Sequence, residues 1–347
     1  MSTTVKPIKP WAATPRDRFI TGLSVGLSLL TSVVVVLATP MKGKLAYFAV
    51  FFLAWFVIDS LFILRKSGSK GVRDGLAAKL TFFGGVLVCM AVFSILWATI
   101  SRGLKGINLA FLTENMRNAS LFDPIGKGGI LHAISGTLML IAIAIIISVP
   151  MGILTALYLT EIKGKAAGLI QFLVQAMSGV PSVVAGLFIF SAILLPITKA
   201  NSSLLGSMAL AILMVPTVAR TAEEVLNLIP NDLREAGVAL GATQWRTVSG
   251  VVVPAAKSGL VTAVILGIAR IIGETAPILL VSGGADALNF NPTSGPMGSL
   301  PFYIWKAFLT GGTEEAYARA WGGMLILLIL IMVLFGLARY LSGRKAS

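Results

Sequence analysis

Three charged side chains lie within otherwise apolar stretches of this sequence. Arg270 and Glu274 occur in GIARIIGETAPILL, and Arg220 occurs in VPTVARTAEEVL. An ionisable side chain near the centre of a bilayer costs about 2.5–3.5 kcal/mol on insertion scales, so a charge placed there is expected to have a function. A guanidinium offers paired, planar donors that match the oxygens of phosphate or sulfate. Two arginines at one depth in a membrane would therefore form a site for a tetrahedral oxyanion.

The carboxylate of Glu274 adds selectivity to such a site. Because Glu274 follows Arg270 by four residues, the two share a helix face and can pair. A carboxylate repels a bare dianion but accepts a hydrogen bond from a protonated oxygen, which favours phosphate over sulfate. Thr275 is a weaker candidate for the same pathway. The alternative is structural: Arg270–Glu274 is then a buried packing pair, and Arg220 pairs with a neighbouring glutamate.

The elements that would position these charges are membrane-spanning helices. The chain is 56% apolar and 12% charged, whereas soluble domains are about 25% charged. Repeated apolar runs of about 20 residues predict an all-α polytopic membrane protein, because every backbone polar group must be satisfied inside the bilayer. Eight spans are expected: Phe19–Thr39, Leu45–Leu64, Leu80–Ile100, Ile130–Leu159, Ala167–Ile197, Leu204–Leu226, Leu260–Leu280 and Trp321–Leu341.

The net charge of +14 is better explained by topology than by nucleic-acid binding. The basic residues cluster beside the spans, and loops rich in Lys and Arg stay on the cytoplasmic side. This pattern predicts a plasma-membrane protein with both termini cytoplasmic, including an uncleaved tail at 1–18 and a short tail at 343–347. The segment Asn227–Pro254 then also faces the cytoplasm. Two longer loops, roughly 101–129 and 281–320, face the outside.

Two further features concern the path through the membrane. Arg220 lies 15 residues before Glu235 and Arg270 lies 16 residues after Pro254, so we expect them at similar depth where both helices leave the loop steeply. In the fifth span, Gly179 and Pro181 interrupt the apolar run between Ser178 and Ser182. Such an interruption exposes backbone donors and hydroxyls to a pathway. Close packing of helices through small residues explains it equally well.

The loop between the sixth and seventh spans carries a recognisable spacing. Glu235-Ala236 is followed by Gly241 and then by a Val-x-Val sequence that ends at Pro254. This resembles the "EAA" loop of ABC importer permeases, E-A-A-x3-G-x9-I-x-L-P, with Gly237 in place of the second alanine. The spacing predicts a short helix over Leu233–Leu240, a glycine break, and a re-entry segment in which Pro254 precedes the next span. Such a helix can fit a groove on a partner protein.

The sequence contains four motifs that belong together: ARIIGETAP (269–277), ARTAEEVL (219–226), REAGVALGA (234–242) and SGVPSVVAGLF (178–188). Together they resemble the permease family of phosphate ABC transporters. The resemblance implies a type I importer fold with a six-helix core, here with two extra N-terminal helices. It implies that Arg220 and Arg270 serve phosphate passage. Its partners would be a second homologous permease, two ATPase subunits that bind ATP and Mg, and an extracytoplasmic phosphate-binding protein.

The predicted organisation has three parts. Residues 1–78 hold the basic N-terminus and the two extra spans, and 79–342 form the permease domain with its coupling loop at 227–256. The tail at 343–347 follows. The chain has no G-x4-G-K-[ST] sequence, so it cannot by itself supply a P-loop ATPase. We expect no enzyme active site, no cofactor and no metal site, since the chain has one cysteine and one histidine.

Two other functions stay open on the sequence. The first is a permease for another oxyanion, such as sulfate or molybdate, which Glu274 disfavours. The second is a proton-coupled secondary transporter that uses Glu274 as a proton relay. The two classes differ in one observable respect, because an ABC permease is isolated with an ATPase and a secondary transporter is not.

Overall fold

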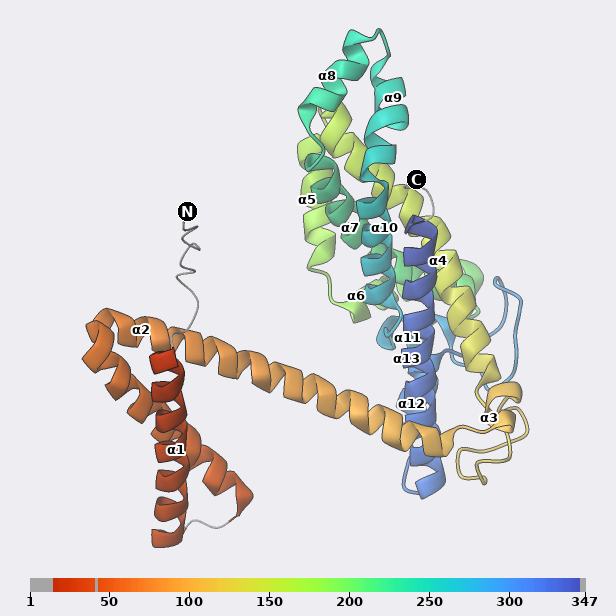
Figure 1. Cartoon of the computed structure of the whole chain (residues 1–347). Helices are drawn as coiled ribbons and strands as arrows, with labels where there is room; N and C mark the ends of the chain where they lie inside the picture. The colour runs from red at the N-terminus through yellow and green to blue at the C-terminus, as the bar shows by residue number, and fades with distance from the viewer. Residues whose placement is uncertain (1–14, 41–42, 344–347) are drawn as a thin grey trace, which may run out of the picture. The chain divides into compact units, whose positions relative to one another are not determined.

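The computed structural model describes residues 15–40 and 43–343, and helices make up nearly all of this part of the chain (Figure 1). Seven of its helices are long and apolar enough to cross a membrane, or eight if a bent pair is counted as one span. The all-α, multi-span prediction is therefore confirmed. The predicted terminal tails lie largely outside the described residues. The chain divides into two compact units, Met1–Ile95 and Leu96–Ser347.

The first unit is built from α1 (Pro15–Ala38) and the larger part of α2 (Lys44–Gly103). The α2 segment turns back on itself at Gly68, whose backbone angles (φ 68°, ψ −167°) suit only glycine. Lys79 is buried and forms an ion pair with Asp59. Ser24 of α1 donates a hydrogen bond to the same carboxylate at 3.0 Å. No local pattern predicts this pair, because Asp59 is an isolated charge in an apolar run.

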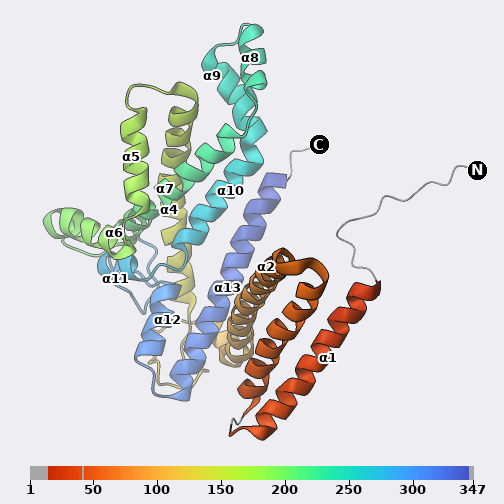
Figure 2. The ribbon, with the colours of Figure 1, turned by 90° about the vertical axis from the view of Figure 1, so that its left-hand side faces the viewer.

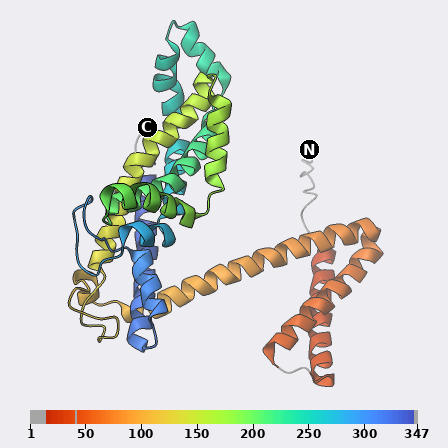
Figure 3. The same cartoon turned by 180° about the vertical axis from the view of Figure 1, so that it is seen from behind.

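The second unit contains the remaining helices, and Figure 3 shows them from behind. Its short segments are the π-helical turns Tyr158–Ile162, Phe190–Thr198 and Val248–Val252, and the 3-10 turn Leu104–Gly106. Its α-helices are α3 (Leu109–Thr113), α4 (Leu131–Leu157), α5 (Ala167–Ser178), α6 (Ser182–Ile189), α7 (Ser203–Asn227), α8 (Asn231–Ala239), α9 (Gln244–Thr247), α10 (Val253–Ile271), α11 (Ala276–Ser282), α12 (Leu300–Leu309) and α13 (Glu314–Gly343).

The core of this unit lies where α4, α7 and α10 pack together (Figure 2). Ser207 of α7 is fully buried and donates a hydrogen bond to the carbonyl of Leu140 at 3.0 Å. Gly152 of α4 and Gly267 of α10 both lie against Val218 of α7. Small residues at these contacts let the helix backbones approach closely, which is the usual way of packing helices in a membrane.

Two of the helical segments are broken rather than straight. The α5–α6 pair bends by 106° at Gly179–Pro181, where the missing amide of proline favours a break. The second break separates α10 from α11 at residues 272–275. The helices that follow the two breaks pack together, because Gly186 of α6 lies directly against Pro277 of α11. A Cβ on Gly186 would stand 2.7 Å from the Cα of Pro277, so this contact requires glycine.

The two ends of the second unit differ in structure. The α8–α9 hairpin projects at one end, and α3, α12 and the start of α13 form the other (Figure 1). At the latter end Arg319 of α13 is fully buried. Its guanidinium donates to the carbonyls of Asp123 (3.2 Å), Pro124 (2.8 Å) and Lys127 (2.7 Å). A single arginine therefore holds the loop between α3 and α4 against α13.

Candidate transport pathway and coupling surface

Arg270 and Glu274 meet at the break between α10 and α11. The Arg270 guanidinium donates a hydrogen bond to the Glu274 carboxylate, so the pairing expected from their spacing is present. Arg270 lies in the last turn of α10, and Glu274 lies in the turn that follows. The Arg270 side chain is 45% exposed and that of Glu274 is 14% exposed. Nearly half of the Arg270 side chain therefore stays exposed while it is paired.

Arg220 lies on an exposed face of α7. Its Nε is 3.8 Å from a carboxylate oxygen of Glu224, one turn further along the helix. Both side chains are more than half exposed, so this ion pair contributes little to stability. Arg220 and Glu224 line a small cavity of about 210 Å³, which polar side chains of α5 and α7 complete: Gln171, Gln175, Glu223 and Asn227. Arg270 is not among the residues that line it.

The two arginines do not lie at the same level. Gly259 of α10 packs against Val225 of α7, and Gly267 packs against Val218, so the helices run antiparallel. Arg220 is therefore level with residues 264–265, about five residues before Arg270, which corresponds to roughly 8 Å at 1.5 Å per residue. The expected equal depth fails because the helix that carries Arg270 begins at Gln244, well before Pro254.

The polar residues near the two breaks occupy separate positions. Ser178 ends α5, and its hydroxyl donates to the carbonyl of Val174 at 2.9 Å. Ser182 begins α6 and is half-buried. Thr275 precedes α11 and is also half-buried. The contact of Gly186 with Pro277 brings the segments that carry Ser182 and Thr275 to the same region of the fold.

The α8 helix presents the predicted coupling motif to the surroundings. It has no buried residue, and both Glu235 and Ala236 are exposed. Beyond it Leu240 is 90% exposed and Trp245 is 65% exposed. Gly241 has φ +81°, a conformation that glycine adopts without strain. An exposed helix with apolar side chains at its end is suited to insertion into a groove on another protein.

Two details of the loop differ from the sequence prediction. Pro254 does not stand before the next span, because residues Gln244–Ile271 form one helical segment that contains it. Proline is tolerated there because it occupies one of the first positions of α10, directly after a π-helical turn. Gly237 lies against Thr247, and a Cβ at this position would stand 2.7 Å from the Thr247 hydroxyl oxygen. The departure from the second alanine of the motif is thus a packing requirement.

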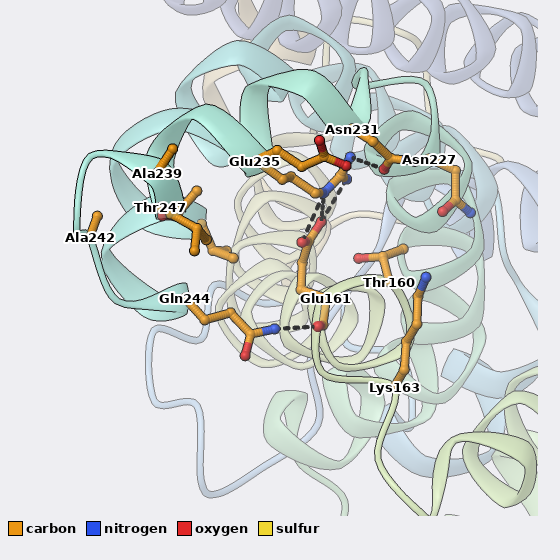
Figure 4. Close-up of a pocket in the computed structure, with 13 residues that line it drawn as sticks. Thr160, Glu161, Lys163, Asn227, Asn231, Glu235, Ala239, Ala242, Gln244 and Thr247 are labelled. Carbon is orange, nitrogen blue, oxygen red and sulfur yellow. Dashed lines mark hydrogen bonds and ion pairs between the residues drawn. The ribbon is translucent and has the colours of Figure 1, made fainter.

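A cavity of about 910 Å³ lies between α8 and the end of α4 (Figure 4). At its centre the Arg234 guanidinium donates to both carboxylate oxygens of Glu161, with Nε–Oε2 at 3.0 Å and Nη2–Oε1 at 2.7 Å. The Glu161 side chain is only 6% exposed. These hydrogen bonds raise the pKa of Arg234, which keeps it charged. Arg234 directly precedes the motif, but no local pattern predicts this pair because Glu161 lies 73 residues away in the sequence.

Comparison with known proteins defines the class of this chain. Residues 148–347 match the family model described as "Binding-protein-dependent transport system inner membrane component". That match covers more than half of the chain, and the chain belongs to this family of transport permeases.

Within the family the chain belongs to the PstA group. It is 36% identical over 291 residues to the phosphate transport system permease protein PstA of Mycobacterium leprae, covering 82% of this chain and 95% of that protein. It is 34% identical over 268 residues to the PstA of Pasteurella multocida, and the match covers 77% of this chain and 91% of that protein. A bacterial ABC transporter for import of the acidic polysaccharide alginate has a similar fold, with 17% identity, a TM-score of 0.52, and coverage of 78% of this chain and 99% of that one.

Proposed function

We propose that this chain is the permease subunit of an ATP-driven importer of inorganic phosphate and forms half of the translocation pathway. The observation that carries the proposal is the exposed α8 helix, with Glu235 and Ala236 on its surface, in a chain whose relatives are phosphate transport permeases. The fold joins this helix to the bundle that holds Arg270 and Glu274. Import of an anion against a negative interior costs about 2.3 kcal/mol per charge per 100 mV, so an energy source is required.

The assembled transporter would contain further subunits. A second homologous permease would close the pathway against the faces that carry Arg220 and Arg270, both of which are open in this chain. Two ATPase subunits that bind ATP and Mg would engage α8 through Glu235, Ala236 and the turn at Gly241. An extracytoplasmic phosphate-binding protein would dock at the opposite end. Membrane orientation follows the positive-inside rule, with both termini cytoplasmic.

Phosphate would contact the two arginines one after the other and not at the same time. Arg270 holds Glu274 at one level, and Arg220 lies about 8 Å closer to α8 on the helical rise of 1.5 Å per residue. As it moves, the anion would replace Glu274 and then Glu224 as the partner of the guanidinium donors. Glu274 would accept a hydrogen bond from the protonated oxygen of monoprotonated phosphate. Ser178, Ser182 and Thr275 would add neutral hydrogen-bonding groups where the broken helices adjoin.

The proposal is tested with the reconstituted complex in proteoliposomes. We expect Arg270→Ala and Arg220→Ala to abolish ATP-dependent phosphate uptake while the ATPase still copurifies in normal amount. Arg270→Lys is also expected to reduce uptake, because lysine lacks the paired donors. Arg246→Lys, on an exposed side chain of α9, is the matched control and should transport normally.

Three results would contradict the proposal. Failure of the alanine variants to assemble would make the arginines structural. Uptake of sulfate or molybdate in preference to phosphate would identify a different oxyanion permease. Purification without an ATPase, together with uptake driven by a proton gradient, would identify a secondary transporter in which Glu274 carries the proton.

A further inference from the structure

The guanidinium of Arg234 connects three separate segments near α8. It makes the two-oxygen contact with Glu161, at the end of the helical segment that continues α4. It also donates to the carbonyl of Leu226 at 3.0 Å and to that of Ile229 at 2.7 Å. These carbonyls belong to the end of α7 and to the turn that leads into α8. One side chain on α8 therefore contacts α4 and α7 simultaneously.

The geometry of these contacts is restrictive. The last carbonyls of a helix have no partner within the helix, and a cation there also offsets the negative end of the helix dipole. An arginine fork has fixed donor directions, so its simultaneous contacts fix both the position and the rotation of the residue that carries it. The carboxylate of Glu161 is nearly buried, which protects the ion pair from screening by water.

The other side of the hairpin reaches the same residue. Gln244, at the start of α9, donates from its side-chain amide to the backbone carbonyl of Glu161 at 2.6 Å. Arg234 before the hairpin tip and Gln244 after it thus converge on Glu161, and Figure 4 shows the contact of Gln244 with Glu161. Apart from these contacts α8 packs on α9 through Gly237 and Thr247, and it contains no buried residue.

We infer that Arg234 is the positioning residue that makes α8 move as one body with the ends of α4 and α7. Force applied to α8 is then passed to α4 through Glu161 and to α7 through the Leu226 and Ile229 carbonyls. Without the Arg234 contacts the turn at 228–230 absorbs the displacement. This inference rests on the proposed function, in which an ATPase engages α8.

The first test measures the movement itself. Spin labels are placed at Leu154→Cys on α4 and Val238→Cys on α8, both exposed positions, in a Cys89→Ser background. Distances are recorded by pulsed electron paramagnetic resonance in the assembled complex, with and without ATP. We expect a single narrow distance that ATP leaves unchanged. With Arg234→Lys or Glu161→Gln the distribution should broaden and shift when ATP binds.

The second test measures phosphate taken up per ATP hydrolysed in proteoliposomes. Arg234→Lys and Glu161→Gln are each expected to lower this ratio about threefold or more. The double variant should be no worse than Arg234→Lys alone, because the Glu161 side chain acts only through Arg234, whereas Arg234 also contacts the Leu226 and Ile229 carbonyls. ATP hydrolysis and the amount of copurified ATPase should stay near wild type, and Arg246→Lys should match wild type throughout.

The possible outcomes separate the inference from the proposed function. If the spin-label distances and the ratio of phosphate taken up to ATP hydrolysed are unchanged in both variants, Arg234 does not have the positioning role. ATP-driven uptake by the wild-type complex would still support the proposed function. Loss of the ATPase from the variant complexes would show that Arg234 and Glu161 are needed for docking of the ATPase. That result would also overturn the positioning role of Arg234. Absence of ATP-driven uptake by the wild-type complex would refute the proposed function, and the distance measurement still decides whether α8 is fixed to α4.

Discussion

Replacing Arg319 with methionine should loosen the loop between α3 and α4. Methionine matches the apolar stem of arginine but has no donor for the carbonyls of Asp123, Pro124 and Lys127. A hydrogen bond to a charged group contributes about 1.5–3 kcal/mol net. The two shortest bonds, at 2.8 and 2.7 Å, therefore represent about 3–6 kcal/mol of stabilisation on that scale.

Part of this stabilisation is recovered in the variant. An apolar side chain needs no desolvation when it is buried, and the freed carbonyls can reach water if the loop moves. We therefore expect Arg319→Met to lower the free energy of unfolding by about 3 kcal/mol, the lower end of that range. For a unit of this size, where 1 kcal/mol shifts the Tm by about 2–4 °C, the Tm should fall by about 6–12 °C.

The assay combines thermal unfolding of the purified full chain in detergent with limited chymotrypsin digestion. Phe122 in the loop is exposed, and cleavage after it should accelerate in the variant. Arg117→Met is the matched control, because Arg117 lies in the same loop with an exposed side chain. If Arg319→Met unfolds and is cleaved like this control, the carbonyl contacts do not stabilise the loop and the reasoning is wrong.

Three further substitutions test other features. Gly106→Ala would place a Cβ against the carbonyl of Ala318 and should lower stability by about 3 kcal/mol, the upper range for overpacking; a Tm equal to wild type would contradict the contact. Gly241→Ala has free space around it but a φ of +81°, so thermal unfolding should show a loss of only about 1 kcal/mol, the strain of the left-handed conformation. Glu274→Gln should make sulfate a stronger competitor of phosphate uptake, and an unaltered competition profile would remove Glu274 from the basis of selectivity.

Local patterns in the sequence predicted the parts of this structure that depend on neighbouring residues. Long apolar runs predicted the helices, since lipid leaves the backbone few alternatives. The spacing around Glu235 predicted a short exposed helix over Leu233–Leu240, and the structure places it at Asn231–Ala239. The four-residue interval between Arg270 and Glu274 predicted their pairing. The boundary at 78/79 and the transport roles of the site residues stay predictions.

The features that the sequence did not reveal depend on distant contacts. Arg234 and Glu161 are 73 residues apart, and no local pattern links them. The pairing of Asp59 with Lys79 depends on the turn at Gly68, which brings two apolar arms together. The depth of Arg270 could not be predicted because Pro254 was expected to precede the span, whereas the helical segment begins at Gln244 and contains it. Each case required knowledge of which helices are neighbours.

The contact between Gly237 and Thr247 has a consequence for how this loop varies among related chains. A Cβ on Gly237 would lie 2.5 Å from the Thr247 methyl carbon, so the space there admits one methyl group and not two. A relative that carries alanine at the position of Gly237 should carry a smaller residue opposite it, or a hairpin that is opened slightly. The two positions should therefore change together during evolution, and an aligned set of sequences in which they vary independently would show that the hairpin relaxes easily.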